Sequence, residues 1–388
     1  MTLRAAWTRF VGIYRGFALL LLNTQVLLLL VVAGLMIRAE WIYQPFSRRH
    51  QAHFGDRLPA LYPGLDRSEI DRLLEESWDR HYEFESHTLF RERPIAGRYF
   101  HVDPAGFRHI KDQGPWPPDP RFLNVFVIGG STTFGYGIAD HQTVPSYLQE
   151  ALEGRTTPPA RVYNLGRGSY YSSQERILFQ KLLVAGIRPH LAVFIDGFNE
   201  YRAQDEPAFA PDLHEYFERR VPSTRRKIDW LDATRVWLAD SPLLRLLRPG
   251  SIDRKPVAKG ADPDRVIDRF LANKKITEGV AASFGIRTAF VWQPISGHRF
   301  DLKRHVLGER ATIEAVHRTG YGRMPERARK EGFAAEIIWA EHLGEEAIPD
   351  PLYIDSVHYA PNMCQALARL IAQELEARGL LTAQRAAR

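Results

Sequence analysis

The stretch LNVFVIGGSTTFG, residues 123–135, decides the fold. Its first six residues are apolar, β-branched or aromatic apart from Asn124, which is the pattern of a buried strand. Gly129 and Gly130 end that strand, and a polar turn that begins at Ser131 follows. A serine at the mouth of such a turn offers its hydroxyl and its backbone N–H together, and acyl transfer needs both. Taken alone, the motif also fits a merely structural glycine-serine turn.

The alternation of apolar strand and amphipathic helix continues beyond this stretch. Further strands are predicted at 161–164, 191–196 and 288–293, and helices at 143–152, 173–185 and 263–284. Continuous apolar strands that alternate with helices predict a parallel sheet covered on both faces. Right-handed crossovers place the turns after the strands along one sheet edge, where ligands bind in such folds. The predicted fold class is therefore α/β, a flavodoxin-like three-layer sandwich with a central parallel sheet.

The uncharged stretch Gly16–Ile37 predicts one N-terminal transmembrane helix. At about 1.5 Å per residue it reaches roughly 33 Å, enough to cross a hydrocarbon core of about 30 Å. A buried core helix and a cleaved signal peptide are the alternatives, but the stretch is longer than a usual signal-peptide core. Arginines flank both ends, and we expect the N-terminus inside because its short basic segment lies close to the span. The chain is then a single-pass membrane protein whose domain is periplasmic or otherwise extracytoplasmic.

Three regions follow from these patterns. Residues 1–40 are the expected anchor, and 41–120 form an Arg-rich membrane-proximal stalk that packs on the main domain and carries a helix at 67–81. Residues 121–388 are the α/β domain. Between about 201 and 261 the alternation gives way to a segment rich in Pro, Arg and Trp. Because loops of that length are usually functional or disordered, we interpret it as an insertion over the catalytic edge, with a short helix at 229–238.

Composition limits the classes of function. A net charge of +6 from 52 Lys+Arg and 46 Asp+Glu is dilute over 388 residues, and the basic run at 219–227 reads as solvated surface. No nucleic-acid partner is therefore expected. The single cysteine, Cys364, has no partner for a disulfide within the chain. Neither HExxH, a Cys/His cluster, GxGxxG nor a Gly-Lys-Ser/Thr is present, so no metal and no cofactor are expected. Protein partners cannot be read from the sequence.

Three further segments place polar residues at predicted strand ends or turns. They are Asn164–Ser169 after the second strand, Gly197–Glu200 after the third, and Asp355–His358 before the C-terminal helix. Small residues in the first segment let a backbone N–H face a carbonyl, and Asn199 in the second offers a side-chain donor. A carboxylate three residues before a histidine can accept from its Nδ1–H and leave Nε2 free as a base. Each segment alone has a structural explanation, whereas their common order and position favour one site.

Together the four segments resemble those of the SGNH (GDSL-like) hydrolases, of the membrane-anchored bacterial type. The likeness covers about 121–380, and Val102–Arg108 is similar to a Gly-Phe-Arg segment that precedes the domain in such members. The resemblance implies Ser131 as the nucleophile, His358 as the general base and acid, and Asp355 as the residue that orients the imidazole. It also implies an oxyanion hole, whose donors are drawn from Ser131, Gly168, Ser169 and Asn199.

The chain departs from the family pattern in three places. The first block reads Gly-Gly-Ser-Thr where the family has Gly-Asp-Ser-Leu, and the third ends in Glu200 where Asp is commoner. In the second block the spacing aligns Ser169 with the family glycine, whereas Gly168 matches it by residue type. Any residue other than proline has the required N–H, so both residues stay candidates for the second donor.

The expected function is a serine esterase or acyl-ester hydrolase that works through a Ser/Asp/His triad and an acyl-enzyme. Its expected substrate is an acylated envelope glycan or lipid, or another acylated small molecule. The alternatives are an O-acyltransferase that modifies an exopolysaccharide and a catalytically silent glycan-binding or assembly protein. Several aromatics near the predicted edge are expected to pack in the core, with stacking on a sugar as the alternative: Tyr170, Tyr171, Phe198, Tyr201 and Trp292.

Overall fold

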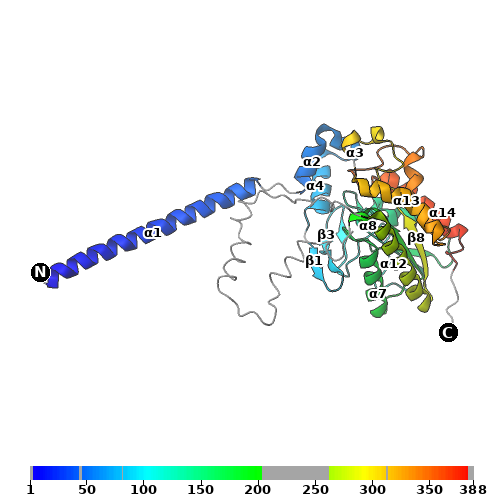
Figure 1. The fold of residues 1–388 in the computed structure, drawn as a ribbon, viewed down its shortest axis with the longest axis horizontal. Coiled ribbons are helices and arrows are strands. Elements are labelled where there is room, and N and C mark those ends of the chain that lie inside the picture. Colours follow the sequence, from blue (N-terminus) through cyan, green and yellow to red (C-terminus); the bar gives the residue numbers. More distant parts are fainter. Residues whose placement is uncertain (1–2, 43–45, 81, 203–261, 312, 383–388) are drawn as a thin grey trace. The chain divides into compact units, whose positions relative to one another are not determined.

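The computed structural model describes residues 3–42, 46–80, 82–202, 262–311 and 313–382. The chain divides into two compact units, Met1–Gln44 with Glu215–Pro256 and Pro45–His214 with Val257–Arg388. The described part of the first unit is the helix α1 (Leu3–Ile42), drawn in blue in Figure 1. Its stretch Trp7–Leu35 is unburied and is long and apolar enough to cross a membrane. The predicted long apolar N-terminal helix is confirmed, and an anchor or a signal sequence fits it equally.

The second unit is built on a five-stranded parallel sheet. Its strands are β5 (Leu123–Gly129), β6 (Ala160–Asn164), β7 (Leu191–Asp196), β8 (Arg287–Trp292) and β9 (Ile337–Trp339), in the order β6-β5-β7-β8-β9. This is the flavodoxin-like order, so the predicted fold class is confirmed. Val127 lies opposite both Asn164 and Val193, which aligns the carboxyl ends of three strands at one edge. The short β9 was not predicted, because three residues give no periodicity to detect.

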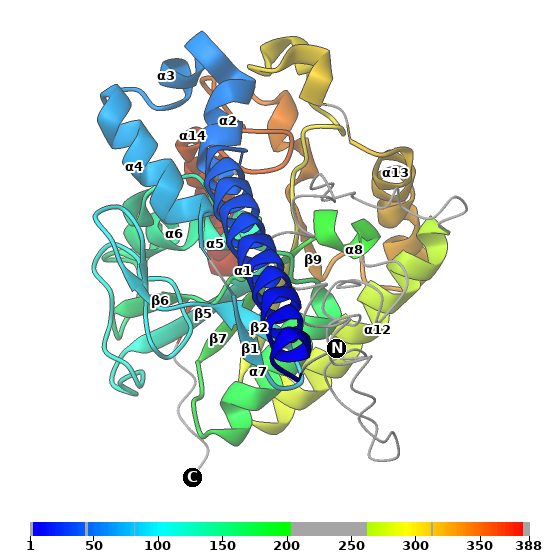
Figure 2. The same ribbon diagram turned by 90° about the vertical axis from the view of Figure 1, so that its left-hand side faces the viewer.

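Helices cover both faces of this sheet, as Figure 2 shows. They are α6 (Val144–Leu152) and α14 (Pro361–Ala377) on one face and α7 (Ser172–Val184) and α12 (Pro263–Ser283) on the other. Because alternate residues of a strand point to opposite faces, Val125 and Val127 belong to one hydrophobic core and Phe126 and Ile128 to the other. The result is the predicted three-layer sandwich.

The described residues contain further helices that the sequence analysis did not predict. They are α5 (Ser131–Phe134), α8 (Phe198–Arg202), α13 (Ala315–Lys330) and 3-10 helices at Asp140–Gln142, Leu302–Arg304, Gly308–Ala311 and Glu341–Glu345. The proposed insertion at 201–261 and its helix at 229–238 fall almost wholly outside the described residues.

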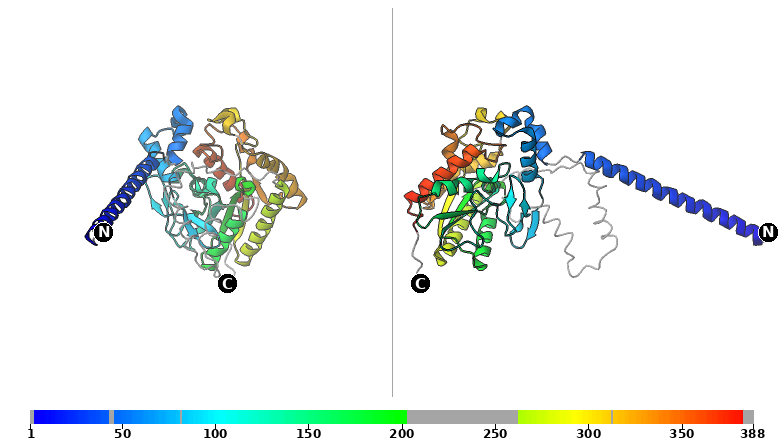
Figure 3. Two further views of the ribbon diagram at one scale, coloured as in Figure 1. Left: turned by 60° about the vertical axis from the view of Figure 1, so that its left-hand side comes forward. Right: turned by 180° about the vertical axis from the view of Figure 1, so that it is seen from behind.

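Residues 46–110, which we name the N-terminal layer, pack on the sandwich (Figure 3). The layer contains α2 (Phe46–Phe54), a 3-10 turn (Gly55–Arg57), α3 (Leu58–Leu61), α4 (Arg67–Trp78), the hairpin β1 (Tyr82–Glu85) with β2 (Leu89–Glu92), and the pair β3 (Ile95–Ala96) with β4 (His101–Val102). Asp66 and Glu69 form a reciprocal capping box that begins α4, which was predicted at 67–81. Leu58, Ile70 and Leu74 share one core with α14. The boundary predicted at residue 120 stays a prediction.

Candidate active site

Ser131 begins the short helix α5 directly beyond the carboxyl end of β5. The two glycines before it are required by close approach: a Cβ on Gly129 would lie 2.8 Å from the carbonyl oxygen of Ile195, and one on Gly130 would overlap the Asn199 amide. The first N–H groups of a helix have no partner within it, so the Ser131 N–H is available to a ligand. Ser131 is partly exposed, whereas the three residues after it are buried.

A chain of hydrogen bonds joins Ser131, His358 and Asp355. The His358 Nε2 lies 2.9 Å from the Ser131 Oγ, and its Nδ1 lies 2.8 Å from the Asp355 Oδ2. An ionised carboxylate only accepts, so we assign the proton to Nδ1, and Nε2 of the neutral ring then accepts from the serine hydroxyl. Folding thus joins two groups that the sequence separates by 227 positions.

The turn that carries the imidazole holds its own carboxylate in place. The Asp355 Oδ1 accepts from the backbone N–H groups of Val357 and His358 at 2.8 and 2.7 Å. Burial raises the pKa of Asp355, but the electrostatic interaction with His358 and the hydrogen bonds from that residue lower the pKa by more. The pKa of this carboxyl therefore lies well below its usual value. Asp355 stays ionised through the neutral and mildly acidic range and keeps orienting the ring.

Two side chains outside the motif fix the backbone of the same turn. The His305 Nδ1 accepts from the Leu307 N–H at 3.0 Å, so we assign the proton to Nε2, which donates to the Asp355 carbonyl at 2.9 Å. The Ser296 hydroxyl donates to the Ser356 carbonyl at 2.5 Å. The sequence analysis missed both supports, because an isolated His or Ser in a loop carries no pattern.

Asn199 lies at the same edge, in the helix α8 that follows β7. Its Nδ2 donates to the Tyr170 carbonyl at 2.7 Å and lies beside Gly130, the residue before Ser131. An amide nitrogen has two hydrogens, so a second donor remains after that bond. Among residues 191–200 Asn199 is the partly exposed one, and the others are buried.

The second block forms a tight turn from Arg167 to Tyr170, closed by a 3.3 Å bond from the Tyr170 N–H to the Arg167 carbonyl. Ser169 has φ +63°, as the third residue of a type II turn does. The peptide N–H of that residue points out of the turn, and among the described residues the Ser169 N–H has no hydrogen-bond partner. The Gly168 N–H differs, because it donates to the Glu92 Oε1 at 3.1 Å.

Two acids tie this turn to the β1–β2 hairpin of the N-terminal layer, Glu92 through the Gly168 N–H and Glu85 through an ion pair with Arg167. Glu92 is 1% exposed, pairs with Arg80 at 2.5 Å and also accepts from the Tyr136 hydroxyl at 2.6 Å. Glu85 pairs with the buried Arg167 at 2.5 Å. Burial raises the pKa of Glu85, but the charge and hydrogen bonds of Arg167 lower the pKa by more. The pKa is therefore lowered to about 2. The sequence analysis missed both acids, because a charge in a polar stretch normally lies on the surface.

Arg108, the last residue of the Gly-Phe-Arg segment, supports the C-terminal end of α5. Its guanidinium is fully buried and donates to the carbonyls of Phe134 and Ile138 at 2.8 and 2.7 Å, and also to that of Gly135. Asp140 supplies the compensating charge at 2.8 Å. The C-terminal carbonyls of α5 are thereby satisfied, which fixes the helix that begins at the serine.

A cluster of three buried acids, Glu175, Asp196 and Glu200, lies near Asn199. Glu200 accepts from the Ser172 N–H at 2.6 Å and from the Ser172 hydroxyl at 3.0 Å, and Arg269 donates to its backbone carbonyl. Burial, reinforced by the neighbouring carboxylates, raises the pKa values of Glu175 and Asp196 well above their usual range. Glu200 thus connects the segment 197–200 to Ser172 at the start of α7, the helix that follows the segment 164–169.

The aromatics expected near the edge are core residues. All five are at most 6% exposed: Tyr170, Tyr171, Phe198, Tyr201 and Trp292. The aromatic ring beside the imidazole comes instead from α4, since the ring centroids of Trp78 and His358 are 5.0 Å apart in an edge-to-face contact. Tyr82 of β1 is 48% exposed, and its hydroxyl lies 3.3 Å from that of Tyr136.

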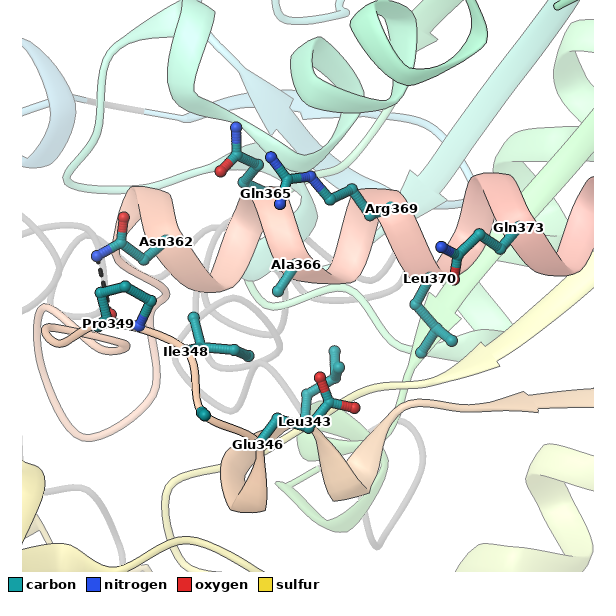
Figure 4. Close-up of a pocket in the computed structure, with 11 residues that line it drawn as sticks. Leu343, Glu346, Ile348, Pro349, Asn362, Gln365, Ala366, Arg369, Leu370 and Gln373 are labelled. Atoms are coloured by element: carbon teal, nitrogen blue, oxygen red, sulfur yellow. Dashed lines mark hydrogen bonds between the residues drawn. The ribbon is translucent and has the colours of Figure 1, made fainter.

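The residues described here contain no group of three or more His, Cys, Asp or Glu placed to hold a metal ion. A surface groove of about 430 Å³ runs along α14, away from the triad (Figure 4). Asn362, Gln365, Arg369 and Gln373 follow one side of that helix, and Ile348 and Pro349 lie across the groove. No triad residue lines it.

Comparison with known proteins found no matching family model and no curated protein of similar sequence. Solved structures of low similarity do align. An acetylxylan esterase from Geobacillus stearothermophilus shares 12% identity over 65% of this chain and 94% of its own, with TM-score 0.37. A GDSL-like lipase from Bacteroides thetaiotaomicron shares 13% over 68% and 93%, with TM-score 0.36. A member of the lipolytic protein G-D-S-L family from Veillonella parvula shares 11% over 66% and 96%, with TM-score 0.34. At scores this low, the conclusions below depend on the geometry of this chain alone.

Proposed function

We propose that this protein is a serine esterase that cleaves acyl esters through an acyl-enzyme formed on Ser131. One observation carries the proposal, namely the unbroken relay from the Ser131 hydroxyl through His358 to the ionised Asp355. A structural serine needs neither a neutral imidazole at 2.9 Å nor a carboxylate that fixes the ring's tautomer. The site lies at the carboxyl edge of a parallel sheet, where ligands bind in α/β folds.

The chemistry follows from the positions of these groups. The Ser131 Oγ attacks the ester carbonyl carbon while His358 Nε2 takes the hydroxyl proton, and the carbonyl oxygen becomes an anion. As the tetrahedral intermediate collapses, His358 returns the proton to the leaving alcohol and the acyl group stays on the serine. Water then attacks the acyl-enzyme with His358 again as base, which releases the carboxylic acid and restores the hydroxyl.

Three N–H groups stabilise the oxyanion in this proposal. They are the backbone N–H of Ser131, the backbone N–H of Ser169 and the free side-chain hydrogen of Asn199. We take Ser169 rather than Gly168 as the second-block donor, because the Gly168 N–H is already committed to Glu92. Donors held in place before the reaction are typically the largest single contribution to such catalysis.

The direct test is covalent labelling of the full chain, purified in detergent. A fluorophosphonate probe is expected to label the wild type at Ser131, and Ser131→Ala is expected to lose both the label and the hydrolysis of p-nitrophenyl acetate. Ser146→Ala is the matched control, because that serine is buried in α6 and has no contact with Ser131 or His358 among its hydrogen bonds. Its hydroxyl donates to the Asp140 carbonyl and accepts from the Lys111 N–H and the Thr143 hydroxyl. Absence of labelling and of turnover in the wild type would refute the proposal.

The substrate that we propose is an acylated envelope glycan or lipid, in keeping with the apolar helix at the N-terminus. O-Acyl transfer to an exopolysaccharide uses the same acyl-enzyme, with a sugar hydroxyl in place of water. Hydrolysis is the leading proposal because it needs only water besides the groups at the site. Product analysis with an acyl donor and a glycan distinguishes the two by the ratio of transferred to released acyl groups.

We further propose that α1 anchors the protein in a membrane as a single span, with the α/β domain outside the cytoplasm. Twenty or so apolar residues suffice to cross a bilayer, and the unburied Trp7–Leu35 exceeds that length. The full chain is expected to stay with membranes after carbonate extraction, and externally added protease is expected to digest the domain in spheroplasts. Release as a shortened soluble chain would identify a cleaved signal sequence instead.

A further inference from the structure

The imidazole of His358 is held by two hydrogen bonds in the free protein, and acylation of Ser131 removes one of them. Its Nδ1 bonds to the Asp355 carboxylate at 2.8 Å, and its Nε2 bonds to the Ser131 hydroxyl at 2.9 Å. In the proposed acyl-enzyme the Ser131 oxygen is an ester oxygen, which has no hydrogen to donate. The bond at Nε2 is then lost, and the ring can swing about the bond at Nδ1 unless another group holds it.

Two aromatic rings contact this imidazole. The Trp78 and His358 ring centroids are 5.0 Å apart with an interplanar angle of 79°, the edge-to-face arrangement that aromatic pairs favour. The Tyr136 ring lies further away, at 6.0 Å, and is tilted by 49°. Neither contact involves Ser131, so acylation leaves both in place. Trp78 makes the closer contact of the two.

Trp78, the last residue of α4, is itself held in place. Its ring packs on that of Tyr136 with centroids 4.9 Å apart, and on that of His50 in α2 at 5.8 Å. The buried hydroxyl of Ser77 accepts from the Gly137 N–H at 2.6 Å, and a Cβ on Gly137 would lie 3.5 Å from the indole nitrogen. The end of α4 is therefore joined to the segment that follows the helix of the nucleophile.

Deacylation needs the imidazole where acylation needed it. Water adds its oxygen to the acyl carbon and gives a proton to His358 Nε2, while the carbonyl oxygen becomes the oxyanion. The bond from that carbon to the Ser131 oxygen then breaks, the serine oxygen takes the proton back from Nε2, and the carboxylic acid leaves. A ring that has swung aside cannot accept the proton of the water, so this step slows while the acyl group stays on the serine.

We propose that Trp78 is a positioning residue that keeps the His358 imidazole in place while Ser131 carries the acyl group. This inference rests on the proposed esterase function and deepens it, because it makes the N-terminal layer a part of the hydrolytic step. Acylation depends less on Trp78, because the Ser131 hydroxyl still holds the ring until it reacts.

The test measures the two steps separately in the full chain, purified in detergent. Release of p-nitrophenol with the protein in excess over p-nitrophenyl acetate gives the rate constant of acylation. Decay of the acetyl adduct, followed by intact-protein mass spectrometry, gives that of deacylation. In Trp78→Leu, deacylation is expected to slow about 5- to 15-fold, the effect of losing one edge-to-face contact and its packing, and acylation by less than about twofold. The acetyl-enzyme therefore accumulates.

Two variants serve as controls. Trp78→Phe keeps an aromatic ring beside the imidazole, so its deacylation is expected to stay within about threefold of the wild type. Trp116→Leu removes a partly buried indole that packs on Phe107 and Phe126 in the core on the other face of the sheet. It is expected to change the two rate constants by the same factor.

Trp78→Met keeps the test decisive if the leucine variant does not fold, because its flexible side chain fills the space without a ring. It is expected to slow deacylation selectively, as Trp78→Leu does. Equal slowing of both steps in the variant that folds, or no slowing of deacylation, would overturn the inference. If p-nitrophenyl acetate does not acylate the wild type, the proposed function fails and this inference fails with it. If the wild type turns over and the two steps respond equally, the inference fails alone.

Discussion

The two ends of the candidate site are positioned in different ways. At the base end, the Asp355 carboxylate takes all three of its hydrogen bonds from residues within its own motif. At the oxyanion end, the Arg167–Tyr170 turn is held by Glu92 and Glu85, which precede their partners by 76 and 82 positions. The carboxylate and the imidazole are thus joined within one short segment, whose backbone His305 and Ser296 also hold. The oxyanion turn instead depends on acids that lie far away in the sequence.

The largest fall in kcat is expected from a change at the base end. Asp355→Asn leaves the turn in place but favours the wrong imidazole tautomer, so kcat is expected to fall by about 10⁴-fold with little change in thermal stability. Steady-state kinetics and a thermal melt measure both. The control is Asp350→Asn, which lies five positions before Asp355 in the sequence. It weakens an exposed ion pair with Arg304. A loss of less than about tenfold would show that the carboxylate does not orient the base.

Asn199→Ala tests the oxyanion end and is expected to have the next largest effect. It removes one oxyanion donor and the bond to the Tyr170 carbonyl, so kcat is expected to fall about 10²- to 10³-fold. Asn124→Ala is the control, since that buried asparagine at the far end of β5 donates to the Asp119 carbonyl. If the two variants have the same kcat, Asn199 is not a donor.

Glu85→Gln tests the ion pair with Arg167 through its pH dependence. The pKa of Glu85 is lowered to about 2 in the folded chain, so the unfolded chain binds more protons between that value and about 4.5. The stability that the ionised Glu85 contributes is complete above pH 5 and is lost as the pH falls toward 2. The stability gap between wild type and variant, followed by unfolding at pH 3 to 7, is expected to narrow on acidification. Glu83→Gln is the control, and its difference in unfolding free energy from the wild type should stay small at every pH. If the difference for Glu85→Gln does not change with pH, Glu85 does not have a lowered pKa in the folded chain.

The smallest effect is expected from Ser169→Gly in the wild type. Removing the left-handed strain stabilises the folded chain by about 1 to 2 kcal/mol, but the extra freedom of glycine in the unfolded chain takes back about 0.5 to 1 kcal/mol. The free energy of unfolding is therefore expected to rise by about 1 kcal/mol or less. Ser169→Ala keeps the strain and should give no rise. A clear loss of stability in the glycine variant would mean that the turn is not strained.

The difference between the two ends also explains what the sequence could predict. The strand of residues 123–129, the Asp355–His358 pair and Asn199 carry their signal in neighbouring residues, and the structure brings them to one edge. The predicted strands 161–164, 191–196 and 288–293 correspond within one residue to β6, β7 and β8. Long apolar runs and turn chemistry are local properties, so a single sequence is enough to find them.

The sequence could not reveal the supports. Glu92 lies in the stretch Arg-Glu-Arg, and nothing in that stretch tells a buried anchor from a solvated charge. Its role depends on Arg80, Tyr136 and Gly168, which come together only in the folded chain. The same applies to Arg108, which the family resemblance placed in a motif without assigning it a structural role. Glu92 and Arg108 both come from the segment that was expected to be a stalk.

The order of the catalytic groups along the chain affects how the protein is made. Ser131 leaves the ribosome long before His358, which lies 227 positions later and just ahead of the last described helix. Until that final turn docks, the hydroxyl has no proton acceptor and is as unreactive as any alcohol. If Ser131 and His358 act as proposed, a chain that ends before His358 therefore has no esterase activity.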